Sequence, residues 1–373
     1  MAPTDHPYTF LMIGVGWRSP YYLNLPPKFP DRLRCSGIVV RTPQRAEEAA
    51  AKWHLPTYLS VDDALAAERP DFVVVAVTWP QTPIMIRYIT ALGVPVLTET
   101  PPAPTVPELH ELWADVGHLD LVQVAEQYHL YPFHQARRAI IDSGRVGQVR
   151  EARLSSSHQY HMTSLLRWYL GVGFEAATVT GLEWTNPLID TIAASGYRDD
   201  PTEQPIRTNL GHFQFASGKV GQYDFTDGQW WNNLRPDLNL LRGSKGEIRD
   251  TTVTAFHDVR TTTTGQLERW QTGLEMQLEG FDLSHVSYGD QVVYRNPWFG
   301  GRLSDDEIAV AEIVATTGAW ARAGAGPNGP YPLADGCQDH ALALAIDDSI
   351  AAGHPVVLEE QPWAGQVSCL ARP

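Results

Sequence analysis

A short hydrophobic strand that runs directly into a Gly-x-Gly turn constrains the fold of this chain more than any other feature. Residues 10–19 read Phe-Leu-Met-Ile-Gly-Val-Gly-Trp-Arg-Ser, with Gly14 and Gly16 in the turn and Ser19 at the third, small-residue position of the dinucleotide fingerprint. Only glycine lets a backbone turn this tightly and lie against a pyrophosphate at the N-terminus of the next helix. Other strand–turn–helix units also use glycine, so the prediction of a nucleotide-binding Rossmann unit depends on the strands and helices after residue 19.

The remainder of the first third of the chain alternates apolar strands with amphipathic helices. We expect strands over 33–41, 72–77, 94–97 and 121–125, and helices over 19–24, 43–53, 62–68, 82–92 and 106–117. Continuous apolar strands between such helices are typical of a parallel sheet covered on both faces. The sequence therefore predicts an α/β, doubly wound Rossmann domain over residues 1–126.

From about residue 150 the pattern changes to longer alternating strands that are rich in aromatic residues. Strands are expected over 149–156, 178–184, 208–215, 221–225 and 238–242, with hairpin turns at 217–219 and 243–246, and helices over 132–143, 304–322 and 339–353. This pattern predicts an α+β domain over 127–373 with a large, mostly antiparallel, open-faced sheet. An exposed aromatic face of that sheet would be a large apolar patch, so we expect a homodimer or higher homo-oligomer formed through it.

Composition and charge exclude several kinds of partner. The net charge of −15 argues against nucleic acid, and no apolar run approaches the roughly 20 residues that cross a bilayer. The first residues lack the basic and apolar regions of a signal peptide, and Cys35, Cys337 and Cys369 are not spaced as metal ligands, so we expect the cytoplasm and no metal. The acidic run at 305–307 follows Ser304, which predicts a helix N-terminus rather than a metal site.

A series of short motifs, in order, resembles the Gfo/Idh/MocA oxidoreductases. The Gly-x-Gly strand is followed by Arg-Thr-Pro-Gln-Arg-Ala (41–46), Ala-Val-Thr-Trp-Pro-Gln (76–81) and Thr-Glu-Thr-Pro-Pro-Ala (98–103). Residues 141–150 are similar to the family's turn into its second domain, residues 161–171 to its helix bearing a catalytic histidine, and residues 243–248 to its sheet hairpin. The resemblance implies an NAD(P)-dependent oxidoreductase acting on a small molecule.

The resemblance also implies which residues contact the cofactor. They lie in the glycine turn and at the ends of the following strands: Gly14, Gly16, Trp17, Arg18, Ser19, Arg41, Thr42, Thr78, Trp79, Glu99, Thr100 and Gln127. In NAD-preferring Rossmann enzymes an acidic residue at the end of the second strand binds the ribose 2′-hydroxyl. Here that place holds Arg41, whose guanidinium suits a 2′-phosphate. We therefore expect NADP, with NAD as the alternative if Arg41 is an ordinary surface arginine.

Two of the family's customary catalytic groups are missing. The usual Glu-Lys-Pro reads Glu-Thr-Pro, with Thr100 in place of lysine, and Ser157 stands where an aspartate is common. Candidates for the proton chemistry are Tyr128, His129 and Tyr131, because histidine titrates near neutrality and tyrosine donates to a developing oxyanion. The resemblance adds His161. Each of the four side chains has packing as its alternative role.

The sequence leaves three functions open. The first is an oxidoreductase with a non-standard acid/base site, acting on a carbonyl, an imine or a sugar-like substrate; thiazolinyl imine reductases resemble the family and also lack the lysine. The second is a cofactor-dependent lyase or glycoside-cleaving enzyme without net redox change. The third is a non-catalytic sensor of NAD(P) or sugar, as in the fungal galactose-pathway repressor that resembles this family.

Overall fold

The computed structural model describes residues 6–371 except 191, 194 and 201. The chain forms two compact units. The first joins the stretch that ends at Pro132 to Trp270–His285 and Arg295–Cys337, and the second contains Phe133–Arg269, Val286–Tyr294 and the stretch from Gln338 on. The units therefore interleave along the chain, whereas the division near residue 126 that we expected follows chain order.

The first unit contains the parallel sheet that the apolar strands predict. Its strand order is β3-β2-β1-β4-β5-β6, and all neighbours run parallel. The chain order reverses between β1 and β4, which is the switch point where doubly wound sheets bind ligands. The strands are β1 (Tyr8–Ile13), β2 (Leu33–Val39), β3 (Thr57–Tyr58), β4 (Phe72–Val75), β5 (Val96–Thr98) and β6 (Val122–Val124).

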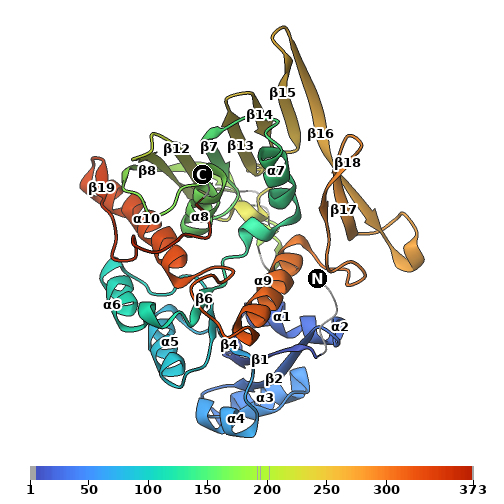
Figure 1. Cartoon of the computed structure of the whole chain (residues 1–373), viewed down its shortest axis with the longest axis vertical. Helices are drawn as coiled ribbons and strands as arrows, with labels where there is room; N and C mark the ends of the chain where they lie inside the picture. The colour runs from blue at the N-terminus through green and yellow to red at the C-terminus, as the bar shows by residue number, and fades with distance from the viewer. Residues whose placement is uncertain (1–5, 191, 194, 201, 372–373) are drawn as a thin grey trace. The chain divides into compact units, whose positions relative to one another are not determined.

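Helices follow these strands as the sequence predicts, and one comes from much later in the chain. They are α1 (Ser19–Leu23), α2 (Leu25–Lys28), α3 (Pro43–Trp53), α4 (Val61–Ala67), α5 (Thr82–Ala91) and α6 (Val106–Val116). Helix α9 (Asp305–Arg322), orange in Figure 1, packs on β1 and β4. This late helix brings residues near position 306 to the N-terminal sheet.

The second unit is built on a large, mostly antiparallel sheet. The sheet's strand order is β18-β17-β16-β15-β14-β13-β7-β12-β11-β8-β19. The strands are β7 (Val149–Ser155), β8 (Ala177–Ile189), β11 (Glu203–Phe215), β12 (Val220–Thr226), β13 (Leu238–Gly243), β14 (Gly246–Arg249), β15 (Thr252–Asp258), β16 (Thr261–Thr272) and β19 (Val356–Leu358). The chain also forms β9 (Ile192–Ala193), β10 (Gly196–Tyr197), β17 (Asp282–Tyr288), β18 (Gln291–Arg295) and the helices α7 (Pro132–Asp142), α8 (Gln159–Leu170) and α10 (Leu333–Ala352).

A buried ion pair ties α8 to α10. A guanidinium nitrogen of Arg167 lies 2.6 Å from a carboxylate oxygen of Asp339, and both side chains are almost fully buried. Arg167 also donates to the Ser368 hydroxyl and to the carbonyl of Gly173. A buried charge is tolerated only when it is paired in this way.

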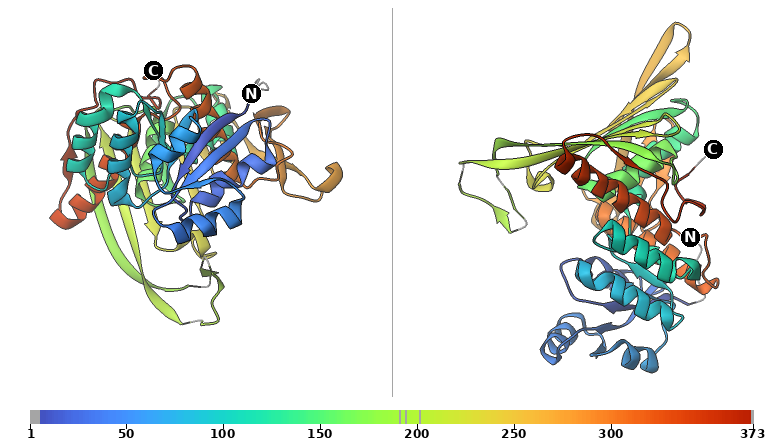
Figure 2. Two further views of the ribbon diagram at one scale, coloured as in Figure 1. Left: turned by 90° about the horizontal axis from the view of Figure 1, so that it is seen from below. Right: turned by 90° about the vertical axis from the view of Figure 1, so that its left-hand side faces the viewer.

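The sheet is mostly antiparallel, as the sequence predicts, and β7 and β12 form a parallel pair within it. Two other features of the second domain differ from the expectation. Strands β8 and β11 are longer than expected and extend as a hairpin beyond their neighbours (Figure 2). They pair with each other along their whole length, and residues 182–187 of β8 are exposed. Helix α10 begins at Leu333 and includes Gly336, where a Cβ would lie 2.6 Å from the Val124 side chain.

None of the helices within residues 6–371, outside the three omitted positions, combines the length and apolarity needed to cross a membrane.

Candidate active site

The glycine turn after β1 has the two properties that a dinucleotide site needs. Gly14 has a φ of +97°, and a Cβ on it would lie 2.2 Å from the carbonyl oxygen of Ala76. Gly16 is exposed, and a Cβ on it would meet nothing within 4 Å. Ser19, at the third fingerprint position, is buried and donates from its hydroxyl to the Gly14 carbonyl at 3.2 Å. The turn is therefore held rigidly at Gly14 and is open at Gly16, which is the cradle that a pyrophosphate would fill.

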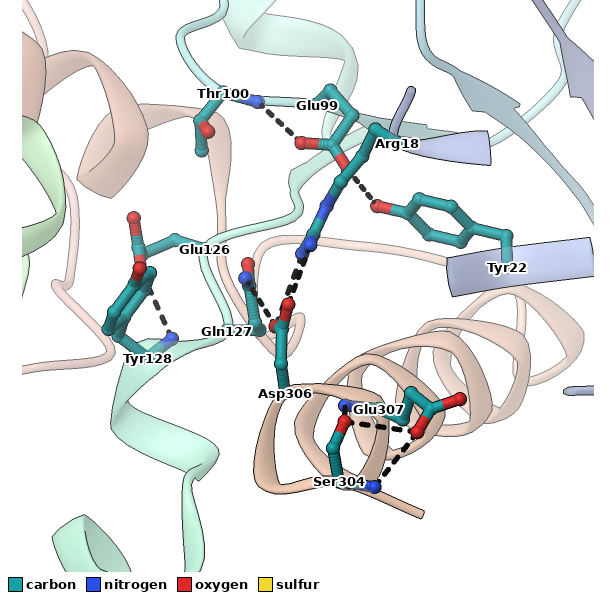
Figure 3. A network of polar contacts seen from close by, with 10 residues as sticks. All are labelled: Arg18, Tyr22, Glu99, Thr100, Glu126, Gln127, Tyr128, Ser304, Asp306 and Glu307. Atoms are coloured by element: carbon teal, nitrogen blue, oxygen red, sulfur yellow. Dashed lines mark hydrogen bonds and ion pairs between the residues drawn. The ribbon is translucent and has the colours of Figure 1, made fainter. Parts of the chain in front are cut away.

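The side chain of Arg18 leaves the turn and binds two carboxylates. Its Nε donates to Glu99 at 3.0 Å, and a terminal nitrogen donates to Asp306 at 2.8 Å (Figure 3). Glu99, which follows β5, also accepts a hydrogen bond from the hydroxyl of Tyr22. Its other oxygen accepts from the backbone N–H of Thr100 at 3.4 Å. Arg18 thus connects the turn after β1 to the end of β5.

Asp306 extends this network to the end of β6. It accepts a hydrogen bond from the Gln127 amide at 3.0 Å, and it is also bonded to the Tyr131 side chain. Burial opposes ionisation of Asp306, but Arg18 and the hydrogen bonds from Gln127 and Tyr131 outweigh this effect and lower its pKa. A single carboxylate from the start of α9 therefore holds the glycine turn and the segment after β6 together.

The acidic run at 305–307 begins a helix, as the sequence predicts. The Ser304 hydroxyl accepts from the Glu307 backbone N–H while the Glu307 carboxylate accepts from the Ser304 backbone N–H, forming a capping box. Across the described ranges, no group of three or more His, Cys, Asp or Glu side chains is arranged to hold a metal ion. The sequence predicts only that Asp306 carries a negative charge at a helix N-terminus. Nothing in the neighbouring sequence indicates that it also bonds to Arg18 and Gln127.

The segment after β6 carries a buried acid that the sequence patterns did not single out. Glu126 is 1% exposed, and its Oε1 accepts the backbone N–H of Tyr128 at 3.1 Å. Burial and the nearby charge of Glu99 raise the pKa of Glu126 to about 8, despite the opposing hydrogen bond from Tyr128. This carboxyl is therefore mostly protonated at pH 7. The sequence signal for it was its place two residues after the buried strand β6.

The two tyrosines and the histidine of the same segment have different surroundings. The rings of Tyr128 and Tyr131 stack, with centroids 4.9 Å apart and planes 10° from parallel. Burial raises the pKa of Tyr131 well above its ordinary value. The ring of His129 lies 5.4 Å from the ring of Tyr331, and burial lowers the pKa of His129 to about 4. His129 is therefore neutral at pH 7.

His161 lies in the second unit, in a cluster of aromatic rings on α8. The His161 ring is 5.0 Å from that of His158 and 4.4 Å from that of Tyr160. Burial, together with the neighbouring His161, lowers the pKa of His158 to about 3. The ring of His158 also packs edge-on against Trp230 at 5.2 Å. His158 is therefore uncharged at neutral pH.

The remaining residues expected to contact the cofactor lie along the carboxyl edge of the first sheet. Arg41 is exposed just after β2 and has no carboxylate partner among the described residues. The hydroxyl of Thr42 accepts from the Arg45 backbone N–H and caps α3. Thr78 and Trp79 are exposed after β4, and the Trp17 side chain is 79% exposed beside Gly16. The network joins Arg18, Glu99, Thr100 and Gln127, while Arg41 and Thr42 stand apart at the β2 end.

Comparisons with known proteins bear on the fold of the chain. Residues 8–126 match the family model described as "Oxidoreductase family, NAD-binding Rossmann fold". No curated protein matches the sequence significantly. A solved structure of an oxidoreductase from Agrobacterium radiobacter, in complex with NAD+, L-tartaric acid and magnesium, is similar with a TM-score of 0.64 and 17% identity, covering 94% of this chain and 98% of that chain.

Two further solved structures are similar over nearly the whole chain. Levoglucosan dehydrogenase in complex with NADH and levoglucosan has a TM-score of 0.65 and 16% identity, covering 94% of this chain and 99% of that chain. The WlbA dehydrogenase from Bordetella pertussis, in complex with NADH and UDP-GlcNAcA, has a TM-score of 0.62 and 17% identity, covering 96% and 99%. At these identities the likeness establishes the shared fold.

Proposed function

We propose that the chain is an NADP-dependent oxidoreductase with a non-standard acid/base site, starting from the match of residues 8–126 to the Gfo/Idh/MocA model of NAD-binding Rossmann-fold oxidoreductases. Its substrate is a small molecule with a carbonyl, an imine or a sugar-like hydroxyl group. The observation that carries the proposal is the rigid turn at Gly14 beside the open backbone at Gly16, at the switch point of the sheet. The sugar ligands of two similar structures support the substrate class.

In this proposal the cofactor lies across the carboxyl edge of the first sheet. The backbone at Gly14, Gly16 and Ser19 receives the pyrophosphate, with Trp17 and Arg18 beside it. Thr78 and Trp79 after β4, Glu99 and Thr100 after β5, and Gln127 after β6 line the nicotinamide half. When bound, the nicotinamide supplies or accepts a hydride. The protein's task is then to hold the substrate and to move the proton that balances the hydride.

The choice of NADP rests on the loop after β2. Residues 39–45 contain no acidic side chain that could accept a hydrogen bond from a ribose 2′-hydroxyl. Among the residues that the structure describes, no carboxylate pairs with the exposed guanidinium of Arg41. Such a group is suited to pair with a 2′-phosphate. NAD is the alternative cofactor, and it is the form found in the similar complexes with NAD+ or NADH.

Arg41→Ala is expected to weaken NADP binding by about tenfold or more and to leave NAD binding nearly unchanged, because a hydrogen bond to a charged group contributes about 1.5–3 kcal/mol. Calorimetric titration with both dinucleotides measures the effect. Arg87→Ala is the matched control, since Arg87 is a surface arginine of the same sheet domain paired with Asp115 on α6. Equal losses for NAD and NADP, or tighter binding of NAD by the unmodified chain, would contradict this assignment.

The proton chemistry is proposed for the segment after β6 and for His161. Neither Thr100 nor Ser157 titrates near neutrality, so the group that exchanges a proton with the substrate, or stabilises its oxygen, must come from elsewhere. Tyr128, His129, Tyr131 and His161 are the candidates. Their packing contacts with neighbouring rings support the alternative structural role equally, so each needs a separate variant.

The two other functions are distinguished by the fate of the cofactor. Net oxidation of NADPH with a panel of carbonyls and imines, or net reduction of NADP+ with sugars, supports the oxidoreductase. Product formation with tightly bound cofactor and no net change in its absorbance at 340 nm would favour the lyase or glycoside-cleaving enzyme. Ligand binding without any chemistry would favour a sensor. The cytoplasm, expected from the cysteine usage, remains the predicted location.

We also propose that the chain forms a homodimer or higher homo-oligomer through the sheet of the second unit. Leu182 and Trp184 lie two residues apart on β8, so they share one side of that strand, and both are exposed. Replacing both with glutamate should shift the protein toward a monomer in sedimentation velocity at micromolar concentration. A sedimenting monomer of the unmodified chain would refute the proposal.

A further inference from the structure

The position of the missing lysine has an acidic neighbour on the next strand. Strands β5 and β6 run parallel with Thr98 opposite Val124, and the Ala125 backbone N–H donates to the Thr98 carbonyl at 2.7 Å. Two residues further along, Thr100 and Glu126 leave the same edge of the sheet. Figure 3 shows both residues on the irregular segments of the chain that follow these strands. Glu126 therefore follows β6, the strand that pairs with the one preceding the residue that replaces lysine.

The surroundings of Glu126 keep its carboxyl neutral. The group is 1% exposed and accepts the backbone N–H of Tyr128. Glu99 and Asp306 disfavour its charge, whereas Arg18 favours it but is already bonded to both of those carboxylates. His129, three residues on, is neutral. Burial and Glu99 together raise the pKa of Glu126 to about 8, so at pH 7 it holds a proton that it can give up.

We propose that Glu126 is the proton source of the reaction, taking over the role for which the family's lysine is missing at Thr100. This assignment rests on the proposed oxidoreductase function and deepens it. In the direction of carbonyl reduction, the Glu126 O–H bond breaks and its proton goes to the carbonyl oxygen, while the hydride goes to the carbonyl carbon. Glu126 is left as a carboxylate and regains a proton from solvent before the next turnover.

Counting the protons released on cofactor binding tests this placement without a substrate. The nicotinamide ring of NADP+ is cationic and that of NADPH is neutral, while both carry the same phosphates. A cation beside Glu126 lowers its pKa by about one unit or more. At pH 7.5 the protein should therefore release about half a proton more on binding NADP+ than on binding NADPH. Calorimetry in buffers of different ionisation enthalpy measures the difference.

Glu126→Gln should abolish the difference between NADP+ and NADPH, because the isosteric amide does not titrate. Glu126→Asp, which keeps an acid at the same position, should retain it. Glu111→Gln is the matched control, since Glu111 is an exposed glutamate on α6 of the same domain. That control should leave the difference unchanged, and circular dichroism verifies that each variant folds.

The possible failures are distinguishable. Equal proton release for NADP+ and NADPH in the unmodified chain, or an undiminished difference in Glu126→Gln, would overturn the role of Glu126 and leave the oxidoreductase proposal standing. Failure of either dinucleotide to bind at millimolar concentration would overturn the proposed function itself, and the role of Glu126 with it.

Discussion

Replacing Gly16 with leucine is expected to abolish dinucleotide binding while leaving the fold intact. Gly16 is exposed, and a Cβ there meets no atom within 4 Å, so the folded chain has room for the new side chain. That room is the space the pyrophosphate must occupy against the backbone. Losing two or more hydrogen bonds to a charged group weakens binding by at least about a hundredfold. Calorimetric titration with NADP+ and NADPH measures the loss.

Two other glycines separate this effect from a change in stability. Gly365 is also exposed, and a Cβ on it meets nothing within 4 Å, but it lies in the second unit, so Gly365→Leu should bind normally. Gly14→Ala should instead lower the thermal unfolding temperature, because its φ of +97° and the Ala76 carbonyl oxygen leave no place for a methyl group. Near-normal affinity of a folded Gly16→Leu protein would show that the cofactor does not lie on this turn.

Removing the side chain that exchanges a proton with the substrate, or donates to its oxygen, should slow hydride transfer by a factor of about 10² to 10⁴. We expect this loss in at least one of Tyr128→Phe, His129→Ala, Tyr131→Phe and His161→Ala, with dinucleotide affinity nearly unchanged. Single-turnover oxidation of NADPH, followed at 340 nm with the best compound of the panel, measures the rate. If Glu126 is the proton source, the four side chains can only donate a hydrogen bond to the substrate's oxygen. The expected loss of rate is then near the lower end of this range.

Matched variants define what counts as a specific loss. Tyr197→Phe removes a hydroxyl from a tyrosine that is 86% exposed in the second unit, and His354→Ala removes an exposed imidazole. Both should keep the normal rate. If all four site variants also keep near-normal rates, the placement of the acid/base chemistry is wrong. If Thr100→Lys creates sugar dehydrogenase activity, the chain is a diverged member of the family's ordinary reaction class.

Local sequence rules predicted the first sheet well because its elements depend on near neighbours. Helix α3 begins and ends where the sequence places it, at Pro43 and Trp53, because Thr42 caps it and Pro43 suits its first turn. Strand β4 is buried along its whole length, which explains its purely apolar run. The glycine turn follows from Gly14, because only glycine adopts that backbone conformation without strain.

The second unit was harder to predict from the sequence because its strands do not all have one buried face. Residues 182–187 of β8 are exposed throughout, so this part of the strand has no buried face. Their extended conformation depends on pairing with β11, as in the pair Pro187 and Pro205. The parallel pairing of β7 with β12 likewise joins strands far apart in the chain. No local pattern encodes either pairing.

The sequence by itself determined the Rossmann turn, the order of strands and helices around it, and the absence of lysine and aspartate at Thr100 and Ser157. Only the tertiary structure decided which charges meet. Asp306 binds Arg18 across 288 positions of the chain, and the burial of Glu126 together with the charge of Glu99 raises its pKa to about 8. Such contacts depend on how α9 and the strand ends pack, and packing is a property of the whole fold rather than of neighbouring residues.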